Sequence, residues 1–277
     1  MTMTNRTQNL FRSLSGTFAF VMLLAAGMSQ AGTTPPAPDA QKLNDLLSRT
    51  AGQTSGFLDQ FSDVKCTELV RQEKLNKDSK VELKEESTYD YLVILTNSAG
   101  ELNLSESRIP VHEAKRDRRN TSMLLSNGFA TLFLVFHPYY AEAFKFDLAG
   151  EETVGGHLLE KVTFQHVQGM KSPAALALRG REYPLELAGT AWIEPQTGSI
   201  AKIEAGIADT LVDVGLKSLR SEIDFAPMPF ADEKQVYWYP TQARVEVETP
   251  KQHWRNLHHF TAYKKFSVST EEQVIKK

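Results

Sequence analysis

The sequence predicts an α+β fold in which one amphipathic helix precedes a meandering antiparallel sheet. Apolar residues first recur at helical spacing, over about residues 39–63, with Leu43, Leu46 and Leu47 on one face. From about residue 64 onward, apolar and polar residues mostly alternate, which is the period of a strand with one buried face. Several such runs follow one another with short turn sequences between them, and strands joined in this way pair antiparallel.

The first residues are expected to form a signal peptide for export and to take no part in the fold. Arg6 and Arg12 give a positively charged start without acidic residues. The apolar run from Phe18 to Ala26 is shorter than the roughly 20 residues that span a bilayer. Small residues stand on the N-terminal side of a predicted cut between Ala31 and Gly32. An uncleaved membrane anchor is the alternative.

Removal of residues 1–31 would leave a linker at residues 32–38, where prolines cluster, and a single domain at residues 39–277. We expect this domain in the periplasm or outside the cell, and not integral to the membrane after cleavage. The net charge of −3 argues against a nucleic-acid partner, which favours a basic chain. Cys66 is the only cysteine, so it is either buried or paired with another chain.

The elements of the first half can be placed from the same patterns. Asp39 suits the N-cap of the helix, and Gly52 to Gly56 is a candidate break within it. The longest strand is expected near residues 80–96, followed by a turn at residues 97–100 and a partner strand at residues 101–110.

The second half is expected to continue the sheet by hairpins. The stretch Gly189 to Ala205, GTAWIEPQTGSIAKIEA, reads as two strands around a turn. Pro195 presets φ for a turn position there, and Gly198 tolerates a positive φ. Another hairpin is expected to turn at Gly155 and Gly156.

Three segments interrupt this pattern. Residues 112–120 are expected to form a charged loop, and the apolar residues 121–136 to form a helix that ends before Pro138. Residues 168–186 are expected to be an insertion that contains a short helix at Pro173 to Leu178.

The order of these segments resembles the LolA/LolB-like periplasmic lipoprotein-carrier superfamily over residues 39–270. The N-terminal helix, FDLAGEETVGGHLLEKVTF, GTAWIEPQTGSIAKIEA and the closing YWYPTQARVEVE…FTAYKKFSVS carry this resemblance. It implies an open antiparallel half-barrel (LolA-like) with an N-terminal helix and a helical lid segment, and a cavity that takes acyl chains in carriers. It implies no individual site residues, and the charged loop and the insertion depart from a minimal carrier.

Aromatic residues are the best candidates for a binding surface. They either form a plain core or line an apolar cavity under a lid that Asn127 and Gly128 would loosen. The predicted ligand-binding residues are Phe129, Phe133, Phe136, Tyr139, Trp192, Trp238 and Trp254. The basic residues Lys115, Arg116, Arg118 and Arg119 form either a solvated loop or a contact surface for anionic lipid headgroups.

Signatures of catalysis are absent from the sequence. It contains no G-x-S-x-G, H-E-x-x-H or P-loop motif, and we expect no metal and no cofactor. On a strand, His253 and His259 would lie about 20 Å apart on one face, too far for shared ligation. The leading hypothesis is a non-catalytic carrier for a lipid, a lipoprotein acyl chain or another apolar group. A structural or partner-binding envelope protein with a self-filled sheet and a secreted hydrolase remain alternatives.

Overall fold

The computed structural model describes residues 38–98, 101–111, 132–178, 181–211, 215–230 and 235–266. These residues belong to one compact unit. The predicted signal peptide, the charged loop at residues 112–120 and Phe129 lie outside the described residues.

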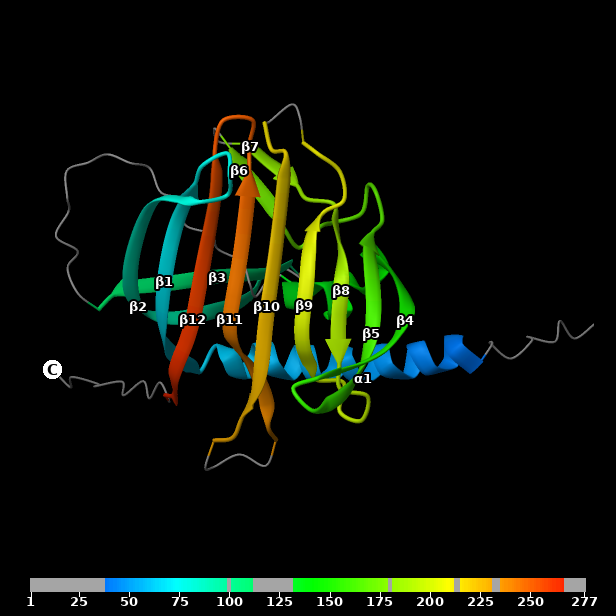
Figure 1. The fold of residues 1–277 in the computed structure, drawn as a ribbon. Helices are drawn as coiled ribbons and strands as arrows, with labels where there is room; N and C mark the ends of the chain where they lie inside the picture. Colours follow the sequence, from blue (N-terminus) through cyan, green and yellow to red (C-terminus); the bar gives the residue numbers. More distant parts are fainter. Residues whose placement is uncertain are drawn as a thin grey trace, which may run out of the picture. The chain divides into compact units, whose positions relative to one another are not determined.

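Ten strands form one antiparallel sheet, in the order β3-β2-β1-β12-β11-β10-β9-β8-β5-β4 (Figure 1). The sheet has two separate edges, β3 and β4, so it is open, and the predicted open antiparallel half-barrel is confirmed. Its strands are β1 Val64–Leu75, β2 Val81–Ser98, β3 Glu101–Pro110, β4 Phe144–Val154, β5 His157–His166, β8 Leu187–Ile193, β9 Ile200–Ile207, β10 Ser218–Met228, β11 Tyr237–Glu248 and β12 His253–Lys265.

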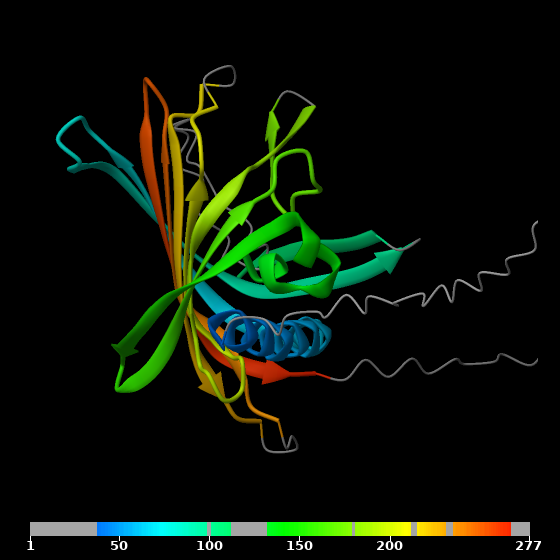
Figure 2. The same cartoon turned by 90° about the vertical axis from the view of Figure 1, so that its right-hand side faces the viewer.

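One long helix, α1 (Pro38–Phe61), lies on the concave side of the curved sheet (Figure 2). Its buried stripe consists of Leu46, Thr50, Thr54, Phe57, Leu58 and Phe61. The predicted break at Gly52 to Gly56 is wrong, because the helix runs through both glycines. Neighbouring elements lie close to the helix at Gly56 and at Thr50. A Cβ added at Gly56 would lie 2.5 Å from the Tyr237 hydroxyl, and one at Gly198 would lie 2.6 Å from the Thr50 nitrogen.

The central apolar segment is described only from residue 132. A short helical turn there ends in η1 (Leu134–Phe136), and η2 (Pro138–Ala143) follows. Pro138 ends one turn and begins the next, since the first position of a helix needs no N–H donor. The His137 ring caps η2 by accepting a hydrogen bond from the Tyr139 backbone N–H, at 3.2 Å.

The predicted helix at Pro173 to Leu178 is wrong. Residues Ala175–Leu178 form strand β6, which pairs antiparallel with β7 (Arg181–Pro184) in a separate two-stranded sheet. The Leu185 backbone N–H donates to the Ala174 carbonyl at 2.9 Å and extends this ladder. An apolar run of four residues has no period that separates a helix from a strand, so the partner strand decided its state.

The predicted turns at Gly155 and Gly156 and at Gly198 are confirmed, whereas the predicted turn at residues 97–100 lies partly outside the described residues. Gly155 and Gly156 join β4 to β5 with φ of 60° and 87°, and Gly198 has a φ of 77° between β8 and β9. These values lie in the left-handed region, which glycine adopts without strain.

The two faces of the sheet bury side chains unequally. The concave face carries the main core together with α1, η1 and η2. A small second cluster, with Leu159, Trp192 and Ala201, is separate from the main core. In the described part of the chain, no helix is long and apolar enough to cross a membrane.

Candidate functional site

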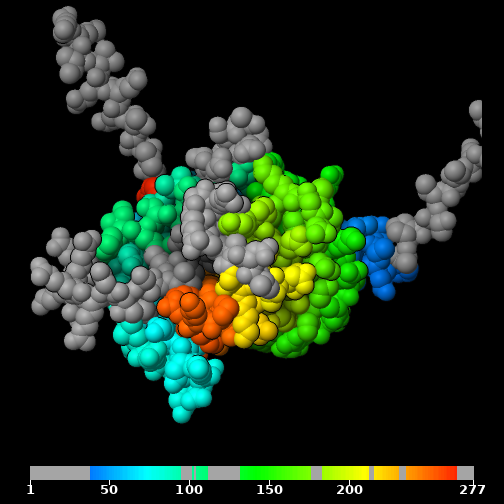
Figure 3. Space-filling model, turned by 90° about the horizontal axis from the view of Figure 1, so that it is seen from above, coloured from blue at the N-terminus to red at the C-terminus, as the bar shows by residue number. Residues whose placement is uncertain are grey.

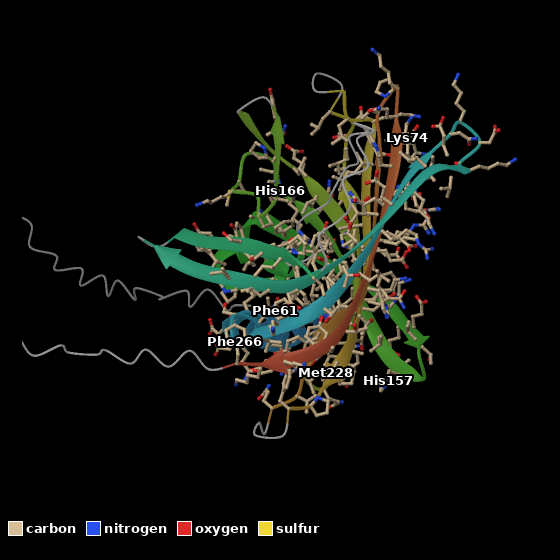
Figure 4. The ribbon with its side chains drawn as sticks, turned by 90° about the vertical axis from the view of Figure 1, so that its left-hand side faces the viewer. Phe61, Lys74, His157, His166, Met228 and Phe266 are labelled. Atoms are coloured by element: carbon tan, nitrogen blue, oxygen red, sulfur yellow. The ribbon has the colours of Figure 1, made fainter. Side chains whose placement is uncertain are left out.

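The lower part of the concave face, in the orientation of Figure 1, is filled by the protein's own aromatic side chains. Phe57 of α1 stacks on Phe61, with ring centroids 4.9 Å apart, and on Phe133, at 4.6 Å. Phe133 in turn meets Phe225 of β10 edge to face at 4.6 Å. Figure 4 places Phe61 within the curve of the sheet. Side chains of α1 and of Phe133, directly before η1, therefore pack into the concave face and form the core there.

The upper part of the same face carries a strip of apolar side chains on neighbouring strands. We call it the upper strip, and it consists of Leu187 (β8), Ile207 (β9), Leu219 (β10), Val247 (β11) and Trp254 (β12). Leu187 pairs with Ile207, Leu219 with Val247, and Val247 with Trp254. All of these except Leu187 are half-buried.

The upper strip lies away from the region that α1 covers. The helix crosses the end of β9 that begins at Ile200, near the Gly198 turn (Figure 1). Ile207, at the other end of β9, is seven residues further on, or about 23 Å along a strand. Figure 3 looks down on this upper end, where the β1–β2 turn, in cyan, projects beyond the β11–β12 turn, in orange.

A buried ionic cluster occupies the side of the concave face that is nearest to the sheet edge β3. Its residues come from strands β12, β1 and β3. Arg108 Nε donates to Glu68 Oε2 at 2.6 Å, and its Nη2 donates to Glu68 Oε1 at 3.0 Å. Arg108 also contacts Glu106, at 3.0 Å, and His258 Nδ1 donates to Glu68 Oε1 at 2.8 Å. The side chains of all four are at most 8% exposed.

Opposing effects set the pKa of Glu68. Burial acts most strongly and would raise this pKa, because a carboxylate loses solvation in the interior. Hydrogen bonds from His258 and Arg108, together with the Arg108 charge, outweigh burial, and the pKa of Glu68 lies below its ordinary value. Glu68 is therefore a carboxylate held in place by its donors.

Cys66 lies beside this cluster and is 2% exposed. Burial raises the pKa of its thiol to about 12, so the reactive thiolate is scarce near neutral pH. Of the two alternatives open from the sequence, the structure favours a buried, unreactive cysteine.

Aromatic contacts are concentrated on one side of the concave face, whereas buried polar residues occur on both sides. Buried polar side chains gather on β12 and β1, where Gln72 pairs with Asn256 in register and both are buried. The β4, β5 side is aromatic, with Phe136 contacting Phe146 at 5.4 Å and Phe164 at 5.8 Å. Glu160 and His166 of β5 are buried on this side as well, so it is not wholly apolar.

The predicted ligand-binding residues do not all lie together. Phe133 and Phe136 are both 4% exposed in the main core, and Trp254 belongs to the upper strip. Tyr139 is 38% exposed and accepts a hydrogen bond from Lys171 Nζ at 2.7 Å. Trp238 is partly buried between the two clusters. Phe129, Lys115, Arg116, Arg118 and Arg119 lie outside the described residues.

Trp192 points away from the concave face. Its indole Nε1 donates to Glu152 Oε2 at 3.0 Å, and the ammonium groups of Lys161 and Lys202 lie 5.4 Å and 5.2 Å from its ring. Its neighbours Ala191 and Ile193 belong to the main core, and successive strand residues face opposite sides.

The convex face carries two open hollows, of about 660 Å³ and 400 Å³. Glu222 and Arg244 border both of them. Charged side chains on β9 and β10 pair with each other on this face. Lys202 Nζ lies 2.6 Å from Glu222 and 2.7 Å from Glu204. Such ladders suit a solvated sheet face.

Metal ligation finds no support in the described residues, which contain no group of three or more His, Cys, Asp or Glu side chains that could hold an ion. His258 is buried against Glu68, whereas its neighbour His259 is exposed, as the strand alternation predicts.

The sequence reasoning missed the ionic cluster. The signal was present in β1, where Cys66, Glu68 and Val70 share one face and a charged residue stands between two apolar ones. A carboxylate in such a position is almost always paired, so a buried partner could have been sought.

Comparisons with known proteins are limited to structure. No family model matches the sequence, and no curated protein matches it. The structure is similar to a solved LolA superfamily protein and to two other solved proteins. A DUF1329 family protein from Desulfovibrio piger is 12% identical, with 87% of this chain and 100% of that chain covered and a TM-score of 0.46. A LolA superfamily protein from Nitrosomonas europaea is 10% identical, with coverages of 84% and 97% and a TM-score of 0.35. A putative outer membrane lipoprotein-sorting protein domain from Vibrio parahaemolyticus is 10% identical, with coverages of 83% and 95% and a TM-score of 0.39.

Proposed function

We propose that the protein is a non-catalytic binding or carrier protein of the periplasm for a lipid, a lipoprotein acyl chain or another apolar group. Its binding surface would be the concave face of the sheet. The observation that supports this most is the upper strip, where neighbouring strands carry half-buried apolar side chains beyond the part that α1 fills. Burial of an acyl chain on such a surface contributes about 0.8 kcal/mol per CH₂.

Two further parts of the proposal concern the cover of this surface. Phe133 and Phe136 would belong to a lid that packs into the concave face when no ligand is bound. Lys115, Arg116, Arg118 and Arg119 would contact anionic headgroups at its rim.

A second candidate is a structural or partner-binding protein of the cell envelope. The filled lower part of the concave face favours it, because Phe57, Phe61 and Phe133 occupy the space that a ligand would take there.

Native mass spectrometry of the protein, purified from the cell envelope without detergent, tests the two candidates. Extra mass in the lipid range that is lost on denaturation would support the carrier. A bare mass in repeated preparations would support the self-filled sheet and redirect the search to protein partners by cross-linking.

A matched pair of variants locates the binding surface. Leu219→Glu introduces a charge into the upper strip at a half-buried position and should lower lipid capture at least tenfold. Leu69→Glu makes the same change on the convex face, where Leu69 is 42% exposed, and should leave capture unchanged. Phe133→Glu is less informative, since a buried charge at a 4% exposed site would destabilise the fold itself.

A further inference from the structure

His137 stands at the junction of η1 and η2, and its ring caps the second of these helices. Its backbone is extended, with a φ of −72° and a ψ of 139°, so the two helical turns are separate. The first turn of η2 has few donors to satisfy, because Pro138 has no N–H and the Tyr140 N–H donates to the His137 carbonyl at 2.9 Å. The remaining donor is the Tyr139 N–H, which His137 Nδ1 accepts at 3.2 Å. A single imidazole nitrogen therefore completes the start of this helix.

A histidine differs from the usual capping residues because its acceptor can be lost by titration. Asn, Asp, Ser and Thr cap helices with oxygen atoms that still accept a hydrogen bond near neutral pH. A neutral imidazole has one acceptor nitrogen, and the bond from Tyr139 requires that Nδ1 is this nitrogen and that Nε2 carries the proton. Once the ring is protonated, both nitrogens are donors, so Nδ1 no longer accepts from the Tyr139 N–H.

The surroundings of the His137 ring keep it neutral at pH 7. Burial acts most strongly on its pKa and lowers it, because an imidazolium loses solvation where the ring is half-buried. The Asp59 carboxylate of α1 acts in the opposite direction, and it is the charged group in the described part of the chain that affects this ring. The pKa of His137 lies below its ordinary value of 6.5, so the proton is taken up in mildly acidic solution.

The cap holds a segment that connects two other parts of the structure. Tyr139 accepts a hydrogen bond from Lys171 Nζ at 2.7 Å, and this ammonium also lies 5.1 Å from the centroid of the Tyr139 ring. Tyr140 and Ala143, on the inner side of η2, are 6% and 4% exposed. The far end of η2 is held separately, because the Ala143 carbonyl accepts from the Val167 N–H at 2.8 Å. Loss of the cap would therefore open the first turn of η2 and leave its last turn attached.

We propose that His137 is a pH-sensitive cap of η2. At neutral pH its Nδ1 binds the Tyr139 N–H and closes the first turn. In mildly acidic solution a proton occupies Nδ1, the hydrogen bond is lost, and the first turn opens together with the contact between Tyr139 and Lys171. This device goes beyond the proposed binding function and does not depend on it, because it operates in the protein without a ligand.

Amide hydrogen exchange between about pH 7.5 and pH 5.5 tests this proposal on the whole protein. The protection factor compares each exchange rate with that of an unfolded chain at the same pH. At the Tyr139 amide it should be constant above the ordinary histidine pKa and fall about five-fold or more below it, as expected for the loss of one capping hydrogen bond. The Val70 amide of β1 should keep its protection, because this range ends above the pH at which Glu68 takes up protons.

Two histidine variants separate the cap from other titrating groups. His137→Asn replaces the ring by a side-chain carbonyl that accepts throughout this range, so the protection of the Tyr139 amide should stay constant. His259→Asn is the matched control, since it removes an exposed histidine from the convex face and leaves the cap intact. It should retain the wild-type fall.

Nitrogen NMR of the histidine rings observes the cap in the unchanged protein. At pH 7 His137 should carry its proton on Nε2 and none on Nδ1, as the bond from Tyr139 requires. A proton on Nδ1 at pH 7 would exclude the capping bond itself. This measurement decides the point even where His137→Asn does not fold.

The exchange results can also overturn the proposal. Constant protection of the Tyr139 amide in the wild type would show that the cap does not titrate. An equal fall in His137→Asn would place the pH sensitivity in another group. None of these outcomes bears on lipid capture by the concave face, so the proposed function is tested separately.

Discussion

Arg108, on the edge strand β3, binds Glu68 on β1 across the intervening strand β2, with Nε 2.6 Å from Oε2. On its way the guanidinium lies 5.0 Å from the ring centroid of Tyr91 on β2. The Arg108 side chain is 8% exposed and that of Glu68 is fully buried. The pair therefore ties an edge strand to the interior of the sheet on the concave face.

Glu68→Gln should lower the free energy of unfolding by about 3 kcal/mol, because it removes the carboxylate that accepts from Arg108 Nε and Nη2 and leaves Glu106 as the remaining counter-charge of this buried guanidinium. Urea unfolding measures this difference. Glu86→Gln is the matched control, since Glu86 binds Arg71 at 2.9 Å on the exposed face and its loss should change stability little. Equal effects of the two variants would contradict a structural role for the buried pair.

Acid should destabilise the protein through Glu68. Its pKa in the folded state lies below the ordinary value of 4.5, so the unfolded chain takes up a proton first as the pH falls. The stabilisation from Glu68 is complete above the unfolded value and is lost as the pH drops through the folded pKa. Unfolding free energies from pH 7 to pH 3 should fall more steeply in the wild type than in Glu68→Gln. Parallel curves would show that Glu68 does not supply the acid sensitivity.

Lys42 should hold the first turns of α1 against the sheet. Its ammonium lies 2.5 Å from Glu160, which is buried on β5, and 3.2 Å from Glu151. Lys42→Met should speed amide hydrogen exchange in the N-terminal half of α1 and leave exchange in β1 unchanged. Lys65→Met removes the exposed pair with Asp90 and serves as control. If exchange in α1 is unchanged in Lys42→Met, apolar packing alone holds the helix.

The two glycines of α1 should respond differently to alanine. Gly52 has open space around its missing Cβ, so Gly52→Ala should stabilise the protein by about 0.5–1 kcal/mol through helix propensity. Gly56→Ala places its Cβ 2.5 Å from the Tyr237 hydroxyl, and displacement of that ring should cancel or reverse the gain. Thermal unfolding of both variants checks this, and an equal gain at both sites would mean that Tyr237 moves aside freely.

The elements that were predicted correctly depend on local patterns. The helix, the long strand near residue 81 and the turns at Gly155, Gly156 and Gly198 follow from residue periodicity and from glycine conformation. Local patterns failed where competing states are close in energy. The Gly52 to Gly56 segment stays helical and residues Ala175–Leu178 become a strand, because neighbouring elements supply the deciding contacts.

The sequence alone determined the fold class, the order of elements and which residues alternate between the two faces of each strand. The tertiary structure alone decided which residues meet. Glu68 and His258 are separated by 190 positions in the chain, and Arg108 lies on the far side of another strand from Glu68. It also placed Trp254 on the concave face and Trp192 on the convex one. The reason is physical: periodicity fixes the direction of a side chain within its own strand, whereas strand order and sheet curvature fix what lies opposite it.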